Sequence, residues 1–397
     1  MKHKSKTQIT LVGGGSSAHA LIPFLDHPDR EIRILTRNPK EWQSNIVIEW
    51  QDSFEKINAT YSGKLSEASS DPAKIIPEAV IIILCMPVFQ YRVALHHIAK
   101  YIHPKKNVLI GTVYGQGGFN WMVEEIKKKF NLHHLSTFTI GLIPWVCRVK
   151  TYGKTGITYG PKAVNVVAFD DQNKFFSTAD IFHDMCFKWF KTGMFKLAEN
   201  FISLTLSVDN QIIHPSRLYA MYQKSKGIWD NLDDVPLFYR DYDDFSAQTL
   251  KDLDDDYSLI RQHIIGHYPN QTFTYMLDYL SLERLSYQSI NESIKESFTS
   301  SKTLATIKTP VVFNNNHWEI DKNHRFFHDD VYYGLCIAKW IASTMNINVK
   351  TIDNMLRWSQ EMLNDKILDD NNQLIERNPQ SGSPSSYGYQ TLNDIIK

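Results

Sequence analysis

Short apolar runs alternate with helical patterns along the first half of the chain. Five runs rich in β-branched residues predict strands, at 8–12, 31–36, 79–85, 107–112 and 136–142. The run 79–85 is apolar throughout, as expected of a central strand that is buried on both faces. Residues 118–130 carry apolar side chains at helical spacing and end in lysines, which predicts a helix. The alternation favours an α/β domain in which helices cover a parallel sheet.

The pattern changes near residue 198, beyond which stretches with a helical period predominate. A chain of 397 residues is also too long for one ordinary hydrophobic core. We therefore predict an α/β domain over 1–198 and an all-α domain over 199–397. Residues 156–169 are predicted to form a hairpin that turns at Gly160–Pro161 and extends the sheet edge with antiparallel strands. The Pro-, Gly- and Ser-rich stretch 378–390 is predicted to be an irregular surface segment.

Composition excludes several classes of partner. Lysine plus arginine and aspartate plus glutamate each number 43, so no global basic field exists that would hold nucleic acid or an anionic membrane. The four cysteines are far apart and form no Cys-x-x-Cys pair, which argues against a zinc module or a disulfide framework. The amino terminus has no apolar core of a signal peptide, and the longest apolar stretch, AVIIILCMPVF, is too short to span a bilayer. These features predict a cytoplasmic protein that binds neither nucleic acid nor membrane.

Three glycines follow the first predicted strand, in the stretch TLVGGGSSAHAL. Gly13, Gly15 and Ala18 fit the pattern Gly-x-Gly-x-x-Ala, which allows a tight turn, close backbone approach to a pyrophosphate, and close packing of the next helix. The N–H groups that begin that helix would face the phosphates. With a strand before it and a helical pattern after it, the turn is a candidate dinucleotide site of the Rossmann type. Pro23 lies within the expected helix and predicts a kink or an early stop.

The residues after the second predicted strand indicate which nicotinamide cofactor binds. A site for NAD usually has an acidic side chain there, which accepts a hydrogen bond from the ribose 2′-hydroxyl. This chain has Thr36 and Arg37 instead, and a hydroxyl with a guanidinium suits a 2′-phosphate. We predict NADP(H), with NAD(H) as the alternative because an arginine in a turn is often merely solvated. Four more residues are assigned to this cofactor site: Gly14, Ser16, Ser17 and Pro87.

Two segments of the second half carry candidate acid–base and anion-binding groups. His214 is followed by Pro215, and an imidazole exchanges a proton near neutral pH, as reduction of a carbonyl or imine requires. The alternative is a buried structural histidine. Arg325 could grip a carboxylate through two parallel hydrogen bonds, and Asp329 or Asp330 could orient an imidazole.

A metal site is the competing interpretation of the second segment. His324 and His328 stand four residues apart with aspartates beside them, a spacing that metal ligands can have. The phenylalanines between them indicate a packed segment, and hydride transfer needs no metal. We therefore predict no metal site.

Taken together, these stretches resemble the opine dehydrogenases of the octopine/nopaline type, over nearly the whole chain. The resemblance is carried by segments in the same order: GGGSSAHA (13–20), GQGGF (115–119), PWVCRVKTYGK (144–154), NQIIHPSRLY (210–219), PLFYR (236–240) and RFFHDDVYYGL (325–335). It implies an enzyme that uses NAD(P)H to join the amine of an amino acid to a 2-oxo acid, often pyruvate. The product is an N-(carboxyalkyl) amino acid.

The resemblance also implies roles for particular residues. His214 would be the general acid–base and Asp330 its charge partner, while Arg325 would anchor the carboxylate of the 2-oxo acid and Gln116 would help to place it. Asp330 is preferred to Asp329 because it stands five residues after Arg325, as the family pattern requires.

Two residues depart from the family pattern. Tyr332 replaces a frequent proline, and Arg37 favours NADP(H) although several relatives use NAD. Neither departure changes the expected reaction type, but the second leaves the choice of cofactor open.

Two other functions stay open at this point. One is an NADP-dependent 2-oxo acid reductase of the ketopantoate type, which yields a 2-hydroxy acid without any amine and shares the two-domain plan. The other is a non-catalytic sensor that binds NADP. The expected partners are a 2-oxo acid and an amino acid, and the protein is expected to be a monomer or a homodimer.

Overall fold

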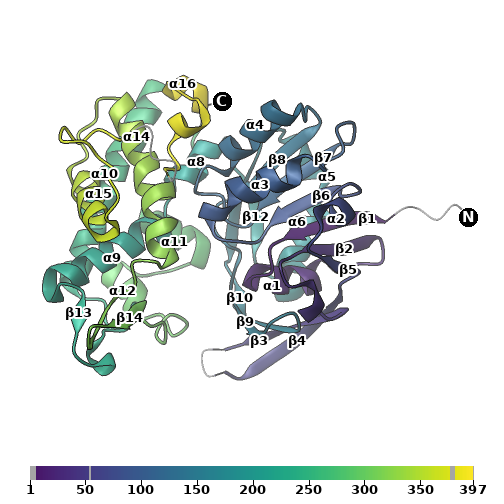
Figure 1. Ribbon diagram of the computed structural model, residues 1–397, viewed down its shortest axis with the longest axis horizontal. Coiled ribbons are helices and arrows are strands. Elements are labelled where there is room, and N and C mark those ends of the chain that lie inside the picture. The colour runs from purple at the N-terminus through teal and green to yellow at the C-terminus, as the bar shows by residue number, and fades with distance from the viewer. Residues whose placement is uncertain (1–5, 53–54, 376–380, 397) are drawn as a thin grey trace, which may run out of the picture. The chain divides into compact units, whose positions relative to one another are not determined.

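An eight-stranded sheet organises the first half of the chain in the computed structural model, which describes residues 6–52, 55–375 and 381–396 (Figure 1). Its strands, in spatial order, are β12 (Met194–Leu197), β11 (Val164–Phe169), β8 (Leu135–Ile140), β7 (Val108–Thr112), β6 (Ile81–Leu84), β1 (Thr7–Val12), β2 (Arg30–Leu35) and β5 (Glu67–Ser69). All pairs from β5 to β8 are parallel, which gives the strand order of a doubly wound dinucleotide-binding sheet. The predicted parallel sheet is confirmed, with strand ends within two residues of those expected.

A second sheet lies beside the first and was not predicted. Its strand order is β4 (Ile57–Lys64), β3 (Asn45–Gln51), β10 (Thr155–Pro161) and β9 (Trp145–Thr151). The predicted hairpin over 156–169 is wrong, because β10 pairs with β9 and β3 whereas β11 pairs with β8. Gly160, with a φ of +101°, lies within β10 at an irregularity in its pairing with β9, and β10 continues to Pro161. The expected antiparallel extension of the main sheet exists, as β11 against β8.

Helix α1 (Ser16–Leu25) lies between the two sheets (Figure 1), and Ser17 through Leu25 are all buried. Close contact with the second sheet depends on Gly63, where an added Cβ would lie 2.5 Å from the Cα of Pro23. Pro23 is inside the helix, which ends two residues later at Leu25. The tight packing around α1 fixes the turn that precedes it.

Short helices complete the first unit. They are α2 (Pro72–Ile75), α3 (Tyr91–Ala99), α4 (Phe119–Phe130), α5 (Asn173–Ser177), α6 (Ala179–Met185) and α7 (Phe187–Phe190). Helix α4 confirms the helix predicted at 118–130. Helices α3 and α4 pack against each other, and α1 contacts α6.

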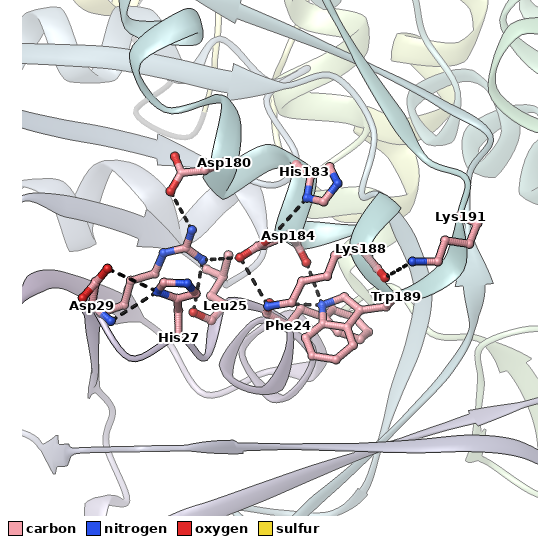
Figure 2. Close-up of polar contacts among 11 residues, drawn as sticks. Phe24, Leu25, His27, Asp29, Asp180, His183, Asp184, Lys188, Trp189 and Lys191 are labelled. Atoms are coloured by element: carbon pink, nitrogen blue, oxygen red, sulfur yellow. Dashed lines mark hydrogen bonds and ion pairs between the residues drawn. The ribbon is translucent and has the colours of Figure 1, made fainter.

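A buried arginine connects α1, β2 and α6. The side chain of Arg30 is 5% exposed, and its guanidinium lies 2.8 Å from Asp184 and 2.7 Å from Asp180. It also donates to the carbonyl of Leu25 at the end of α1. Figure 2 shows Asp180 and Asp184 on α6 turned toward the segment that contains Leu25. This ionic network fixes the start of β2, the strand whose other end leads to Thr36.

The second unit combines Gln116–Gly118 with the chain from Thr205 onward, and the first unit contains the rest up to Leu204. Helix α8 (Phe201–Leu206) runs from one unit into the other, a few residues after the predicted boundary at 198. The helices that follow are α9 (Asn210–Ser225), α10 (Asp244–His267), α11 (Tyr279–Tyr287), α12 (Ile294–Thr299), α13 (Arg325–His328), α14 (Cys336–Thr344), α15 (Lys350–Leu363) and α16 (Leu392–Ile395). The second unit is therefore mainly helical, as predicted.

Two features of the second unit differ from the sequence prediction. A small sheet of β13 (Ile228–Trp229), β15 (His317–Ile320) and β14 (Val311–Asn314) interrupts the helical pattern. The stretch 378–390, expected at the surface, includes four buried residues at 381–384, because Gly382 donates its N–H to the carbonyl of Tyr332; residues 378–380 lie outside the described part. Among the residues described, no helix has the length and apolar character needed to cross a membrane.

Candidate active site

The glycine turn lies where the carboxyl ends of β1, β2 and β6 meet, since β1 stands between the other two strands. Gly13 has a φ of +102°, and an added Cβ would lie 2.7 Å from the carbonyl oxygen of Cys85, just past β6. Only glycine fits this position. Gly15 precedes α1 as its N-cap without a side-chain hydrogen bond, and Ser16 and Ser17 form the first turn. The N–H groups of the first two residues of α1, Ser16 and Ser17, have no partner within the helix, so they can bind an anion.

The remaining predicted cofactor residues surround this turn. Ala18 is fully buried, as the small third position of the motif requires. Pro87 follows β6 and precedes the short helix Val88–Gln90. Thr36 is buried at the end of β2, whereas Arg37 is exposed and forms no ion pair with any residue that the structure describes. The turn, a buried hydroxyl and a guanidinium open to solvent therefore lie at the edge where a dinucleotide fold binds its cofactor.

Tyr152 is a neighbour of this site that the sequence did not predict. Its hydroxyl lies 3.1 Å from Oγ1 of Thr36, and an added Cβ on Gly14 would lie 2.5 Å from it. The residue belongs to the turn between β9 and β10, in the sheet that the sequence analysis missed. A side chain at position 14 would push this hydroxyl away from Thr36.

His19 joins the glycine turn to the β9–β10 turn. Its Nε2 accepts the N–H of Gly153 at 2.8 Å, so its Nδ1 carries the proton and donates to the carbonyl of Gly15 at 2.9 Å. Burial lowers the pKa of His19, which keeps the imidazole neutral in this arrangement. This histidine is structural, and it fixes the first turn of α1.

In the second unit, α9 brings His214 to Asp330. Nδ1 of His214 lies 2.7 Å from Oδ2 of Asp330, and the two side chains are 2% and 1% exposed. Burial lowers the pKa of His214, and the positive charges of Arg325 and His324 act in the same direction. Burial likewise raises the pKa of Asp330. The other oxygen of Asp330, Oδ1, has no hydrogen-bond partner in the described part of the chain.

Two aromatic residues enclose the imidazole of His214. The ring of Phe326 stacks on it at 3.5 Å between centroids, and the hydroxyl of Tyr239 lies 3.2 Å from Nε2. Both nitrogens of His214 are therefore engaged. Tyr239 belongs to the segment PLFYR, which contributed to the family resemblance, but nothing in the sequence assigned it a role.

Arg325 is the accessible cation next to this pair. Its side chain is 45% exposed, and its closest carboxylate is that of Asp329, at 3.9 Å. Its guanidinium lies 5.2 Å from the ring centre of Phe326, the residue that stacks on His214. Asp330 thus contacts the imidazole while Asp329 faces the arginine, a division of roles that agrees with the preference for Asp330 as the partner of His214.

A π-helical turn, Val331–Leu335, follows Asp330 directly. Gln211, one turn before His214 on α9, donates to the carbonyl of Tyr333 at 2.8 Å. An added Cβ on Gly334 would lie 2.8 Å from the Cβ of Gln211. Single π-turns occur frequently at functional sites. Here the turn packs closely on α9, which keeps Asp330 in line with His214.

Gln116 is buried in the second unit, where its amide donates to the carbonyl of Ser207. The hydroxyl of Ser207 in turn accepts the N–H of Leu277 at 2.7 Å. Gln116 is thereby fixed beside the segment that leads into α9, the helix of His214. Near Arg325, His324 is the N-cap of α13, and no group of three His, Cys, Asp or Glu side chains that could hold a metal occurs among the described residues.

Comparison with known proteins gives a consistent result. Residues 197–363 match the family model described as NAD/NADP octopine/nopaline dehydrogenase, alpha-helical domain. Octopine dehydrogenase of Mizuhopecten yessoensis is 23% identical over 98% of both chains. The chain is therefore a distant homologue of octopine dehydrogenase over nearly its full length, and an opine dehydrogenase-like oxidoreductase.

Solved structures share the fold. An octopine dehydrogenase in complex with NADH and agmatine superimposes with a TM-score of 0.82 at 20% identity over 98% of both chains. A yersinopine dehydrogenase with bound NADP+ gives 0.62 at 12% identity, over 90% of this chain and 91% of that one. A ketopantoate reductase from Ralstonia eutropha gives 0.56 at 10% identity, over 90% of this chain and 99% of that one. One of these opine dehydrogenases therefore binds NADH and another binds NADP+.

Proposed function

We propose that this protein uses NADPH to couple the amine of an amino acid to a 2-oxo acid, with pyruvate as the first candidate. An ammonium group and a ketone lose water to form an iminium, and addition of one hydride gives a secondary amine. The buried pair of His214 with Asp330, beside the exposed guanidinium of Arg325, is the observation that carries the proposal. It provides a proton carrier next to a site for a carboxylate, and both the 2-oxo acid and the amino acid carry a carboxylate.

In this proposal His214 exchanges the protons of the reaction. The amine must lose a proton before it attacks the ketone, and the hydroxyl that leaves must gain one. Asp330 stabilises the charged imidazole, which burial alone would disfavour. Arg325 binds the carboxylate of the 2-oxo acid with its free N–H groups. Gln116 helps to place that substrate.

The cofactor would be held at the glycine turn, and the reduced nicotinamide would supply the hydride. Gly13 permits the tight turn against Cys85, where no Cβ fits, and the N–H groups of α1 would bind the phosphates. Gly14, Gly15, Ser16, Ser17, Ala18 and Pro87 keep their proposed places around it. Thr36 and Arg37 would receive the 2′-phosphate of NADP(H), and the absence of an acidic residue at this position favours NADP(H) over NAD(H).

The likeness to a ketopantoate reductase fold supports a second candidate, reduction of a 2-oxo acid without an amine. Both reactions need a proton carrier and a carboxylate anchor, so the fold does not separate them. A sensor that only binds NADP would need neither His214 nor Arg325. Dependence of the rate on an amine distinguishes the opine dehydrogenase reaction from the reductase, and turnover distinguishes both enzymes from the sensor.

The test is NADPH oxidation with a panel of 2-oxo acids, each assayed alone and with each amino acid in turn. We expect one or more amino acids to raise the rate far above that with the 2-oxo acid alone. The variant His214→Asn should lose about 10²–10⁴ in kcat and bind NADPH as the unchanged protein does. Equal rates with and without every amino acid would support the reductase, and binding without any turnover would support the sensor.

A further inference from the structure

The proposed proton carrier has no free nitrogen. Nδ1 of His214 lies 2.7 Å from Asp330, Nε2 lies 3.2 Å from the hydroxyl of Tyr239, and the ring of Phe326 stacks at an interplanar angle of 17°. The His214 side chain is only 2% exposed. A substrate therefore cannot reach Nε2 directly while Tyr239 is in place. Any proton that leaves or enters His214 at Nε2 has Tyr239 as its neighbour.

The hydrogen bonds fix the direction of this contact. The positive charge of Arg325 favours the ionised form of Asp330, against the effect of burial. When Asp330 is ionised, its carboxylate can only accept, so Nδ1 of the neutral imidazole carries the proton and Nε2 is the acceptor. The hydroxyl of Tyr239 then donates to Nε2. Burial raises the pKa of Tyr239, so the phenol keeps its proton at neutral pH. Asp330, His214 and Tyr239 thus form a continuous chain of hydrogen bonds.

Helix α9 also positions Tyr239, through an arginine that the reaction does not otherwise use. Arg217 stands three residues after His214, on the same side of the helix. Its guanidinium donates to the carbonyls of Phe238 and Asp241, at 3.0 and 2.8 Å. Arg217 is 1% exposed. Helix α9 therefore carries the imidazole and also fixes the backbone on both sides of Tyr239. Proton transfer requires such fixed positions of donor and acceptor.

We propose that Tyr239 is a catalytic residue that passes the proton between His214 and the substrate. The proposal rests on the proposed function. As the amine is deprotonated, the ammonium proton moves to the phenol oxygen while the phenol proton moves to Nε2. The amine nitrogen then attacks the ketone carbon, the C–N bond forms as the C=O double bond becomes a single bond, and one proton passes from that nitrogen to the oxygen to give a carbinolamine. As water departs, the C–O bond breaks, the leaving oxygen takes the phenol proton, and Nε2 returns a proton to the phenol oxygen. The iminium forms, and both His214 and Tyr239 return to their starting states.

Tyr239→Phe removes only the hydroxyl and tests the proposal. We expect kcat to fall by about 10²–10³, within the range for general acid–base groups, while the Kd of NADPH stays unchanged. Tyr279→Phe is the matched control, because Tyr279 packs on the same Phe298 ring and its hydroxyl bonds Ser297 instead of His214. The control should keep the parent kcat. A loss below about tenfold in Tyr239→Phe, or a gain, overturns the proposal.

NMR of 15N-labelled histidine gives a readout that needs no substrate. In the unchanged protein, Nε2 of His214 should be the unprotonated nitrogen of the neutral ring, with the signal assigned from His214→Asn. Tyr239→Phe should raise the pKa of His214, because the lost hydrogen bond stabilised the neutral form. The charged and titratable groups that face this site from neighbouring elements are common to both proteins: Asp209, Tyr242, His324, Arg325, Asp329 and Asp330.

The two readouts separate the two hypotheses. Suppose that no substrate pair is turned over, while Nε2 of His214 is unprotonated and the pKa of His214 rises in Tyr239→Phe. The proposed function then fails, but the hydrogen bond from Tyr239 to His214 is confirmed. If the unchanged protein is active while Nε2 carries the proton, or the pKa of His214 does not move, the role of Tyr239 is contradicted. The NMR measurement on the unchanged protein also decides the matter if the variant fails to fold.

Discussion

Replacing Asp330 by asparagine should remove most of the turnover while the protein stays folded. At 2.7 Å, and with an effective dielectric constant of about 20, the attraction between an imidazolium and this carboxylate is about 6 kcal/mol. Asparagine carries no charge, and its amide can donate to Nδ1, which would move the proton of the neutral ring to Nε2. His214 could then no longer accept a proton at Nε2.

The expected loss follows from these two effects. The electrostatic attraction sets an upper limit of between 10⁴ and 10⁵ at about 1.4 kcal/mol per factor of ten, and part of it is offset by the cost of burying the charges. We expect kcat of Asp330→Asn to fall by about 10³–10⁴, as when the carboxylate of a catalytic triad is replaced. The Kd of NADPH should not change, because Asp330 is not among the residues proposed to hold the cofactor.

The assay is steady-state NADPH oxidation with the best substrate pair, together with thermal unfolding and NADPH titration. Asp256→Asn is the matched control. Asp256 is another buried aspartate of the same unit, and it accepts the N–H groups of Thr351 and Ile352 at the start of α15. It should affect stability but not kcat. A loss of less than about tenfold in folded Asp330→Asn would show that Asp330 does not support proton transfer at His214.

Three further predictions concern other parts of the molecule. Arg325→Lys should raise the KM for the 2-oxo acid about tenfold to 100-fold, because a lysine cannot form two parallel hydrogen bonds to a carboxylate; an unchanged KM in steady-state kinetics would contradict this. Arg37→Ala should weaken NADPH at least about tenfold and leave NADH unaffected, and equal effects in fluorescence titrations would rule out a role for Arg37 at the 2′-phosphate. Asp184→Asn should lower the free energy of unfolding by about 1–3 kcal/mol, since the buried Arg30 then keeps only Asp180 as an ionic partner. Burial alone would raise the pKa of Asp184, but the hydrogen bond from His183 and the charge of Arg30 outweigh it and lower the pKa. The stabilisation is therefore present above the unfolded pKa of about 3.9 and is lost as the pH falls through the lower folded pKa. On acidification, the thermal unfolding midpoint of the unchanged protein should fall more than that of Asp184→Asn, and an equal fall in both proteins would contradict this.

The parallel sheet could be predicted because its central strands leave a strong signal in the sequence. β6 is buried along its whole length, and only apolar residues tolerate that environment. The second sheet left no such signal. β4 is mostly exposed and polar, and β9 is exposed over its second half, so neither shows a clear alternation. The pairing of β3 with β10 joins segments about a hundred residues apart, which no local pattern reveals.

In the site, too, features with a local sequence signal could be predicted and features that depend on distant contacts could not. The glycine turn was predicted because its requirements are local: a strand, a positive φ at Gly13 and a helix. The contact between His214 and Asp330 spans 116 residues, and only the family resemblance indicated it. Tyr239 was missed because its position depends on backbone contacts with Arg217, which are invisible in the sequence. Tyr152 was missed together with the sheet that carries it.

The most direct test of the proposed reaction follows one hydrogen atom. NADPH with deuterium at the transferable position of the nicotinamide is incubated with the protein, a 2-oxo acid and the amino acid that gives the highest rate. We expect a secondary amine in which the former keto carbon of the 2-oxo acid carries the deuterium, formed about 10²–10⁴ more slowly with His214→Asn. A deuterated 2-hydroxy acid as the sole product, formed equally without the amino acid, would contradict it.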